Sequence, residues 1–333
     1  MKSLRDNFKF PILLPTHMLS TSASPQSPVS AHDIKWHVQE LRRQVAALEL
    51  ANDACLFETY PDALHQRALS LLSCDSSDAI ILNKFKVDFR HRDLICLRPE
   101  QWLNDEVVNL YLQLSQERDS AITRSSPYPR NPNVFMSSFF YTKLVHFQGG
   151  FNYSGVKNWT KKIDIFTCNQ VFFPINIKNE HWTLVCVSML QKKIYYLDSL
   201  GRSGKTITGN ILKWLQEESL SRTQKPAPGF SVEDISCPQQ SNSYDCGIFT
   251  LAFVDLLANE LSVEIMQQSL CDNLRLSLCI AITRGQLVRA NSMYDVHCTL
   301  ITFRGCPELL RQFKFPGLIR FLGMNRRRMP SRN

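Results

Sequence analysis

Three β-rich runs follow one another closely in the middle of the chain, and they constrain its fold more than any other feature. Residues 171–177, 182–187 and 193–197 are rich in Val, Ile, Phe and Tyr and are separated by polar turns, which is the pattern of successive strands. Only residues 188–192 separate the second run from the third, and so short a connection favours an antiparallel pair. The sequence therefore predicts a β-sheet in this region.

Helical patterns flank these strands. Residues 105–118 carry apolar side chains at spacings of three and four behind Asn104, a residue type that caps helix N-termini. Residues 247–258 are apolar almost all round, which indicates a helix buried on every side, and residues 264–282 indicate a further helix. Together these elements predict one mixed α+β domain over residues 80–285.

The two ends of the chain differ in composition from this middle part. Residues 1–79 form an N-terminal extension with a Ser/Pro-rich linker at 20–31 and a short amphipathic helix that contains residues 34–48. Residues 286–333 form a C-terminal extension of unknown role. Its last 30 residues carry 8 basic and 1 acidic side chains. Such a tail can bind nucleic acid, acidic lipid or an import receptor, but we interpret it as a solvated end that requires no nucleic acid.

Composition excludes several classes of protein. No run of about 18 apolar residues occurs, so we expect no membrane span. The 11 cysteines are odd in number and form no CxxC pair, which argues against a disulfide framework and a zinc ribbon. A reducing compartment fits this cysteine usage better than a secreted location. We also expect no secretory signal, because no small-residue cleavage site follows the first apolar segment.

Cys246 stands directly before the predicted buried helix, in a polar and turn-rich segment. A thiol at a helix N-terminus lies near the positive end of the helix dipole and near free backbone N–H groups, which favour the thiolate. We expect Asp245 to cap this helix end and Gly247 to keep the approach to the sulfur open. The alternative is a buried structural cysteine, the usual case for one thiol among 11.

A nucleophilic cysteine needs a base, and the base needs a group that orients it. His181 lies in the turn that leads into the strand at 182–187, and Asp198 ends the neighbouring strand. If the two strands pair, the Asp198 carboxylate can accept the Nδ1–H of His181 and fix its tautomer. Alternatively, His181 is a surface turn residue and Asp198 is a turn former.

Gln240 is a candidate for a third role at the same site. It lies six residues before Cys246 in the chain. Its side-chain amide can donate to the oxyanion of a tetrahedral intermediate, together with the backbone N–H of Cys246. The alternative is a loop glutamine without a partner.

Six short motifs occur in order along the middle of the chain. They are residues 102–108 (WLNDEVV), 139–144 (FFYTKL), 156–163 (VKNWTKKI), 180–182 (EHW), 196–199 (YLDS) and 238–247 (PQQSNSYDCG). Together they closely resemble the ubiquitin-like-protein-specific cysteine proteases, the SUMO (sentrin) proteases of peptidase family C48. An ordered set of this kind is highly specific, and the resemblance covers roughly residues 80–285.

The resemblance implies both a fold and a catalytic set. The fold is that of a papain-like cysteine protease, with a central mixed β-sheet flanked by helices. The family's His–Asp–Cys triad falls on His181, Asp198 and Cys246, and its oxyanion glutamine falls on Gln240. No metal or cofactor is required for this chemistry.

The resemblance also implies how a substrate is held. The family clamps the Gly-Gly tail of the modifier beneath two tryptophans, which match Trp102 and Trp182 here. Only glycine can thread a flat slot between indole rings, because any Cβ would collide. Asp105 matches a position that pairs with an arginine of the modifier. From the residues alone, the indoles can equally serve core packing, and Asp105 can be a first-turn acid favoured by the helix dipole.

The predicted activity is that of a thiol isopeptidase and endopeptidase that cleaves after the C-terminal Gly-Gly of a SUMO-like modifier. Its partners would be this modifier and its lysine-linked conjugates, with cleavage of the modifier precursor as a second reaction. The expected location is the nucleus, with the cytoplasm as a second location, and no oligomeric state is predicted. The alternatives are a protease for NEDD8 on the same fold, an acetyltransferase built on the same triad, and a non-catalytic modifier-binding protein or scaffold.

Overall fold

The computed structural model of the chain describes residues 60–126, 130–145 and 150–287. The Ser/Pro-rich linker, the helix around 34–48 and the basic C-terminal extension lie outside these residues, and the domain boundaries at residues 80 and 285 stay predictions. None of the helices in the described part of the chain has the length and apolar character needed to cross a membrane.

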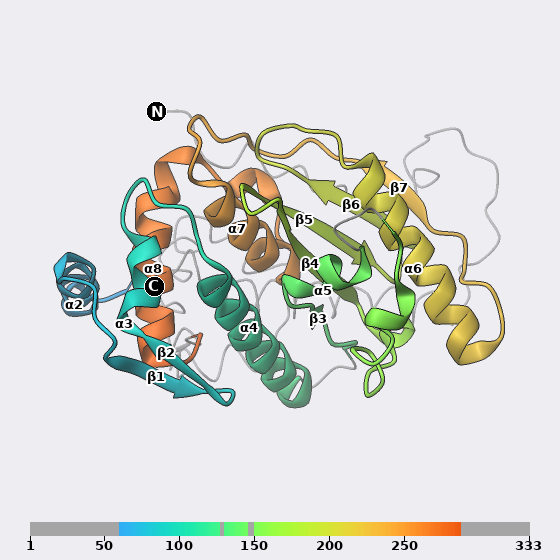
Figure 1. The fold of residues 1–333 in the computed structure, drawn as a ribbon, viewed down its shortest axis with the longest axis horizontal. Coiled ribbons are helices and arrows are strands. Elements are labelled where there is room, and N and C mark those ends of the chain that lie inside the picture. Colours follow the sequence, from blue (N-terminus) through green and yellow to red (C-terminus); the bar gives the residue numbers. More distant parts are fainter. Residues whose placement is uncertain (1–59, 127–129, 146–149, 288–333) are drawn as a thin grey trace, which may run out of the picture. The chain divides into compact units, whose positions relative to one another are not determined.

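A five-stranded mixed β-sheet forms the centre of the described fold (Figure 1). In spatial order its strands are β3 (Val134–Phe135), β4 (Gln170–Ile177), β5 (His181–Ser188), β6 (Lys193–Leu197) and β7 (Ser231–Asp234). The three central strands pair antiparallel, and the two outer strands pair parallel to their neighbours. The three predicted strands and the predicted antiparallel pair are confirmed, whereas the sequence analysis did not find the short strands β3 and β7.

Helices cover both faces of the sheet, because the side chains of β4 and β5 alternate between two apolar clusters. Phe172 and Leu184 belong to a cluster that also contains residues of several helices, among them α4 (Asp105–Ser125), α7 (Cys246–Ala258) and α8 (Cys271–Arg284). Phe173 and Val185 belong to a second cluster, which contains residues of two other helices. All eight residues of β5 are buried, as expected of a strand that is covered on both faces. The first face carries α4, α7 and α8, and the second carries α5 (Phe139–Leu144) and α6 (Lys205–Thr223).

This arrangement confirms the predicted α+β fold with a central mixed sheet flanked by helices. Two of its helices begin as the sequence indicates. The side chain of Asn104 accepts a hydrogen bond from the Val107 N–H at 2.9 Å, which caps α4, although α4 continues seven residues beyond the predicted end at 118. Helix α7 is buried almost all round, as its composition predicts.

The predicted helix over 264–282 is wrong in its first part. Residues 263–270 form two short 3-10 turns, η6 (Val263–Ile265) and η7 (Gln268–Leu270), and α8 begins only at Cys271. The side chain of Gln268 explains the irregular backbone, since it accepts from the Ser241 N–H and donates to the Asp245 carboxylate. A regular helix would move this side chain away from both partners.

The segment before α4 contains elements that the sequence analysis did not predict. They are α2 (Asp62–Ser73), the antiparallel hairpin β1 (Ile80–Lys84) and β2 (Val87–Arg90), and the short helix α3 (His91–Leu94), followed by the 3-10 turn η3 (Ile95–Leu97). Helix α2 contributes Ala68 and Leu72 to the core beneath α8. Phe85 and Lys86 connect the hairpin with φ values of 54° and 64°, the left-handed pair that a two-residue hairpin turn requires.

Candidate active site

Cys246 is the first residue of α7, and only 2% of its surface is exposed. The first backbone N–H groups of an α-helix have no partner within the helix, so these groups and the positive end of the helix dipole lie beside the thiol. The prediction that Asp245 caps this end is wrong. Asp245 occupies the N-cap position but makes no side-chain hydrogen bond to α7; its carboxylate binds Arg275 of α8 instead, with 2.7 Å between Oδ1 and Nη2.

Gly247 has a different role from the one predicted. A Cβ atom at this position would lie 2.8 Å from the Cβ and 2.9 Å from the Cγ of Leu103. The absence of a side chain therefore makes room for Leu103, which packs against the start of α7. It is this close packing, rather than an open approach to the sulfur, that requires glycine here.

His181 and Asp198 lie together, as the strand pairing predicts. His181 is the first residue of β5 and Asp198 follows β6 directly. The His181 Nε2 atom lies 2.7 Å from Asp198 Oδ1, and both side chains are buried. The sequence analysis named Nδ1, which is the wrong ring nitrogen. The register pairs Leu184 with Leu197, so Asp198 lies diagonally across from His181 and only the distal nitrogen reaches it.

The charge state of His181 is set by its two partners. Burial by itself lowers the pKa of the imidazole, but hydrogen bonds and charge interactions with Asp198 and Cys246 outweigh it and raise the pKa from 6.5 to about 9. Since Nε2 is taken by Asp198, Nδ1 is the nitrogen left for the Cys246 thiol. At neutral pH the ring therefore carries a proton on each nitrogen and lies between a carboxylate and a sulfur.

Asp198 is held in place by three donors. Besides His181, the Leu200 N–H donates to Oδ1 at 2.7 Å and the Tyr196 hydroxyl donates to Oδ2 at 3.1 Å. Burial raises the pKa of this carboxyl, but these hydrogen bonds and the charge of His181 outweigh burial and lower the pKa below 3.8. The carboxylate stays ionised and fixes the orientation of the imidazole.

Gln240 is buried and has partners of its own, so it is not a free loop residue. Its Oε1 accepts from the Ser199 hydroxyl at 2.6 Å, and its backbone N–H donates to the Ser199 carbonyl. Its Nε2 donates to the Asn242 carbonyl at 2.7 Å. A primary amide has two N–H donors, so one remains for another acceptor. The residue next to Asp198 thus anchors Gln240 in the turn that precedes Cys246.

The two predicted tryptophans connect the loop at residues 102–103 to β5 and to the turn before Cys246. Trp182 is buried on β5 and its Nε1–H donates to the Leu103 carbonyl at 2.9 Å. Trp102 is 49% exposed, and its Nε1–H donates to the Ser243 carbonyl at 2.9 Å. With both indole N–H groups occupied, the exposed face of Trp102 is what remains for a ligand.

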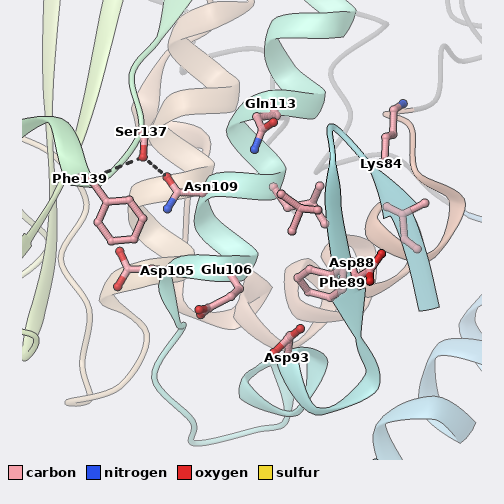
Figure 2. A pocket seen from close by; sticks show the side chains of 13 residues that line it. Lys84, Asp88, Phe89, Asp93, Asp105, Glu106, Asn109, Gln113, Ser137 and Phe139 are labelled. Carbon is pink, nitrogen blue, oxygen red and sulfur yellow. Dashed lines mark hydrogen bonds between the residues drawn. The ribbon is translucent and has the colours of Figure 1, made fainter. Parts of the chain in front are cut away.

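Asp105 is the first residue of α4, three positions after Trp102. It lines a hollow of about 270 Å³ between α4 and the β1–β2 hairpin (Figure 2), and none of the four predicted catalytic residues lines this hollow. Its Oδ1 accepts from the Ser138 hydroxyl at 2.5 Å. A side chain that reaches Asp105 would therefore come from a partner large enough to extend across the surface to α4.

Sequence reasoning missed two residues of the site. Ser199 was not singled out because a serine beside a turn is common, and Arg275 was seen only as part of a helix. Its pairing with Asp245 joins residues 30 positions apart, for which a single sequence contains no periodic signal. Among the described residues, the eight cysteines are free thiols, and no group of three or more His, Cys, Asp or Glu side chains is placed to hold a metal ion.

Comparison with known proteins links this geometry to one family. Residues 101–282 match the family described as "Ulp1 protease family, C-terminal catalytic domain". The chain is 34% identical to the ubiquitin-like-specific protease ESD4 of Arabidopsis thaliana over 196 residues, which cover 55% of this chain and 37% of the relative. It is 32% identical to the sentrin-specific protease 2 of Homo sapiens over 246 residues, which cover 69% of this chain and 40% of the relative.

A solved structure indicates the same family. The C-terminal Ulp1 protease domain, in complex with Smt3, the yeast ortholog of SUMO, superposes with a TM-score of 0.58 at 25% identity. The superposition covers 69% of this chain and 98% of that domain. This chain spans about two fifths of the length of the two sequence relatives described above.

Proposed function

The chain belongs to the Ulp1 protease family, and we propose that it is a cysteine protease that cleaves after the C-terminal Gly-Gly of a SUMO-like modifier. One observation carries the proposal: the His181 Nε2 atom lies 2.7 Å from Asp198 Oδ1, and the buried thiol of Cys246, at the start of α7, is among the groups that raise the His181 pKa. A thiol, a base and a group that orients the base are the parts that nucleophilic catalysis by cysteine requires.

The first half of the reaction uses Cys246 as nucleophile. Its thiolate forms a bond to the carbonyl carbon of the terminal glycine, and the C=O electron pair moves onto the oxygen. The backbone N–H of Cys246 and the free N–H of the Gln240 amide are the donors for this oxyanion. When the C=O bond re-forms, the C–N bond to the lysine side chain breaks, and the His181 imidazolium gives its Nδ1 proton to the departing amine.

The second half of the reaction returns the enzyme to its starting state. His181, now neutral, takes a proton from a water molecule, whose oxygen attacks the thioester carbon. Collapse of the second tetrahedral intermediate expels the Cys246 thiolate and releases the modifier with a free carboxylate. Asp198 keeps its hydrogen bond to Nε2 throughout and stabilises the imidazolium that forms again.

The choice of a SUMO-like modifier rests on the relatives and on the surface around the site. One relative is a sentrin-specific protease, and the superposed Ulp1 domain is bound to the yeast ortholog of SUMO. The exposed Trp102 indole and the Asp105 carboxylate, which lines a hollow beside α4, are two separate contact points for a substrate. Two such contacts suit a folded protein substrate better than a short peptide.

A covalent probe tests this function directly. We would incubate the full chain with SUMO that carries a C-terminal vinyl sulfone, alongside the matching ubiquitin and NEDD8 probes, and map the modified residue by mass spectrometry. We expect a SUMO adduct at Cys246 that is absent from the Cys246→Ala variant. An adduct only with NEDD8 would replace the substrate but keep the mechanism, and a folded chain that reacts with no probe would contradict the proposal.

We also propose a nuclear location, which the family and the basic cluster at residues 326–328 support. A fluorescent reporter fused to residues 304–333 should accumulate in the nucleus, and the same fusion with the three arginines changed to glutamine should not. A reporter that stays in the cytoplasm in both forms would remove the support of the cluster.

A further inference from the structure

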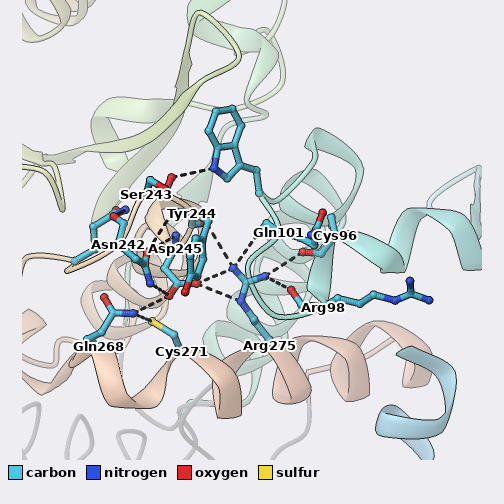
Figure 3. A network of polar contacts seen from close by, with 12 residues as sticks. Cys96, Arg98, Gln101, Asn242, Ser243, Tyr244, Asp245, Gln268, Cys271 and Arg275 are labelled. Carbon is cyan, nitrogen blue, oxygen red and sulfur yellow. Dashed lines mark hydrogen bonds and ion pairs between the residues drawn. The ribbon is translucent and has the colours of Figure 1, made fainter. Parts of the chain in front are cut away.

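Arg275 is an arginine of α8, only 1% exposed, whose guanidinium lies at the centre of a polar network (Figure 3). Its Nη1 donates to the carbonyls of Cys96 and Arg98 at 3.0 Å each. Its Nη2 donates to the Gln101 carbonyl at 2.8 Å. Nε and Nη2 both donate to Asp245 Oδ1, at 3.2 and 2.7 Å. The five N–H donors of the guanidinium therefore all have acceptors.

These acceptors belong to two segments, and each segment leads into a predicted site residue. Gln101 directly precedes Trp102, and Asp245 directly precedes Cys246. The same segments are joined a second time by the hydrogen bond from Trp102 to the Ser243 carbonyl. A guanidinium is a rigid planar fork, so Arg275 fixes both the distance and the orientation between the loop with Trp102 and the turn with Cys246.

The Asp245 carboxylate is turned away from the helix that it precedes. Its Oδ2 accepts from Asn242 Nδ2 and Gln268 Nε2, both at 2.7 Å, while Oδ1 binds Arg275. An aspartate at an N-cap position ordinarily accepts from the first N–H groups of its helix, but this one does not. An N-cap side chain accepts from the second or third residue of the helix, so the N–H groups of Gly247 and Ile248 are thereby left without this carboxylate.

We propose that Arg275 is a positioning residue for the Cys246 site. Its guanidinium holds the Asp245 carboxylate off the N-terminus of α7 and fastens the loop before Trp102 to the turn before Cys246. This inference rests on the proposed function. Without the guanidinium, an uncompensated negative charge lies one residue from the thiolate, and the carboxylate can turn onto the first turn of α7 and offset the positive end of its dipole.

The charged groups around Cys246 form two balanced pairs. On the sheet side, the imidazolium of His181 on β5 faces the Asp198 carboxylate. On the α8 side, Arg275 faces Asp245. Cys271 of α8 also interacts with Asp245, but burial above all raises the pKa of its thiol, which stays neutral. Loss of Arg275 therefore leaves one negative charge in excess, and this excess opposes the thiolate.

The pH dependence of alkylation at Cys246 tests the charge part of the proposal. The full chain reacts with iodoacetamide between about pH 5 and 10, and the modified fraction of the peptide that contains Cys246 is measured by mass spectrometry. We expect Arg275→Met to move the midpoint to higher pH by about one unit. The double variant Arg275→Met/Asp245→Asn should move it back towards the wild type, because the excess charge is gone.

A matched control separates this effect from the loss of any arginine that pairs with an aspartate beside α7. Arg130 binds the Asp119 carboxylate at the opposite end of α7, with 2.9 Å between Nη2 and Oδ1. Arg130→Met should leave the alkylation midpoint of Cys246 where it is in the wild type. The proposal is overturned if folded Arg275→Met keeps the wild-type midpoint, or if the double variant is shifted as far as the single one.

A further variant keeps the test decisive if Arg275→Met does not fold. Asp245→Asn retains an oxygen for Arg275 but removes the negative charge, so the midpoint should move to lower pH. An unchanged midpoint in this folded variant would overturn the charge part. Alkylation needs no modifier, so it gives a result even if the wild type reacts with no SUMO probe, which would contradict the proposed function alone.

Arg275→Lys tests the fastening of the two segments. Lysine keeps a positive charge beside Asp245, but the three donors of its single nitrogen cannot serve that carboxylate and the Cys96, Arg98 and Gln101 carbonyls together. We expect an alkylation midpoint close to that of the wild type and adduct formation with the SUMO vinyl sulfone that is slower by about tenfold or more. Wild-type rates of adduct formation in this variant would overturn this part of the proposal.

Discussion

The two ends of α7 are each held by an arginine–aspartate pair, but the pairs treat the helix differently. At the C-terminal end, Arg130 and Asn133 both bind Asp119, and both also donate to the Ala258 carbonyl, at 3.3 and 3.1 Å. The last helical carbonyl is thereby satisfied. At the N-terminal end, Arg275 draws the Asp245 carboxylate away, and the side chain at the N-cap position leaves the first N–H groups uncapped.

The pKa values of the two carboxyls are shifted in opposite directions, which matches this contrast. Burial raises the pKa of Asp119 and is only partly offset by Arg130 and Asn133. Burial also raises the pKa of Asp245, but the Asn242 amide and Arg275 outweigh it and lower the pKa. One end of α7 is thus built to complete the fold, whereas the other keeps its dipole and donors available for chemistry.

The strongest test of this contrast removes the nucleophile from the N-terminal end. Cys246→Ala should reduce turnover of a SUMO-fusion substrate at least about a thousandfold, because no other group at the site can form the thioester. The midpoint of thermal unfolding should change little, since only one sulfur atom is lost from a tightly packed position. Turnover that survives in Cys246→Ala would contradict the assignment of this end of α7.

The next test changes the group that orients the base. Asp198→Asn should reduce kcat/KM by about a hundredfold to ten-thousandfold. The hydrogen bond that His181 donates to Asp198 is the main factor that raises the His181 pKa to about 9, so the imidazolium of the variant loses its proton at lower pH. The alkaline limb of the pH–activity profile should therefore move from about pH 9 towards neutrality. A limb that stays in place would show that Asp198 does not set this ionisation.

The opposite result is expected at the C-terminal end. Arg130→Met should lower the free energy of unfolding by about 2–3 kcal/mol, within the range for hydrogen bonds to a charged group, because the buried Asp119 carboxylate and the Ala258 carbonyl each lose a donor. Chemical denaturation measures this loss, and kcat/KM per folded molecule should stay at the wild-type value. A large loss of kcat/KM in the folded variant would mean that both ends of α7 serve the reaction.

The smallest effect is expected from Gly247, which directly follows the nucleophile but has a packing role. Gly247→Ala places a methyl group against Leu103, and such overpacking destabilises by about 1–3 kcal/mol. Gly209→Ala on α6 is the matched control, because a Cβ at Gly209 meets nothing within 4 Å. This control should raise the stability by about 0.5–1 kcal/mol. Equal behaviour of the two variants would contradict the packing role of Gly247.

The predictability of these regions from the sequence differs for physical reasons. Strands β4 to β6 and helix α7 were found because long apolar runs have a period that a single sequence displays. Strand β3 has two residues, too few for any period. The ring nitrogen of His181 was misassigned because it depends on the strand register, and the start of α8 was misplaced because Gln268 binds partners that are distant in the chain.

The role of Asp245 shows the same limit more sharply. An aspartate directly before an apolar helix has the local pattern of an N-cap, and the local pattern is what the sequence analysis used. Its actual partner, Arg275, comes 30 residues later and from another helix. A long-range ion pair overrides a local preference here, and only the assembled structure contains the information that decides between them.

The span of the contacts made by Arg275 also determines when, during synthesis, the site is completed. His181 and Asp198 are 17 residues apart and meet through one hairpin, whereas Arg275 and Gln101 are 174 residues apart. Long-range contacts form late, because the intervening chain must be ordered first. A chain whose synthesis has not reached α8 therefore lacks every contact that Arg275 makes around the segments before Trp102 and Cys246.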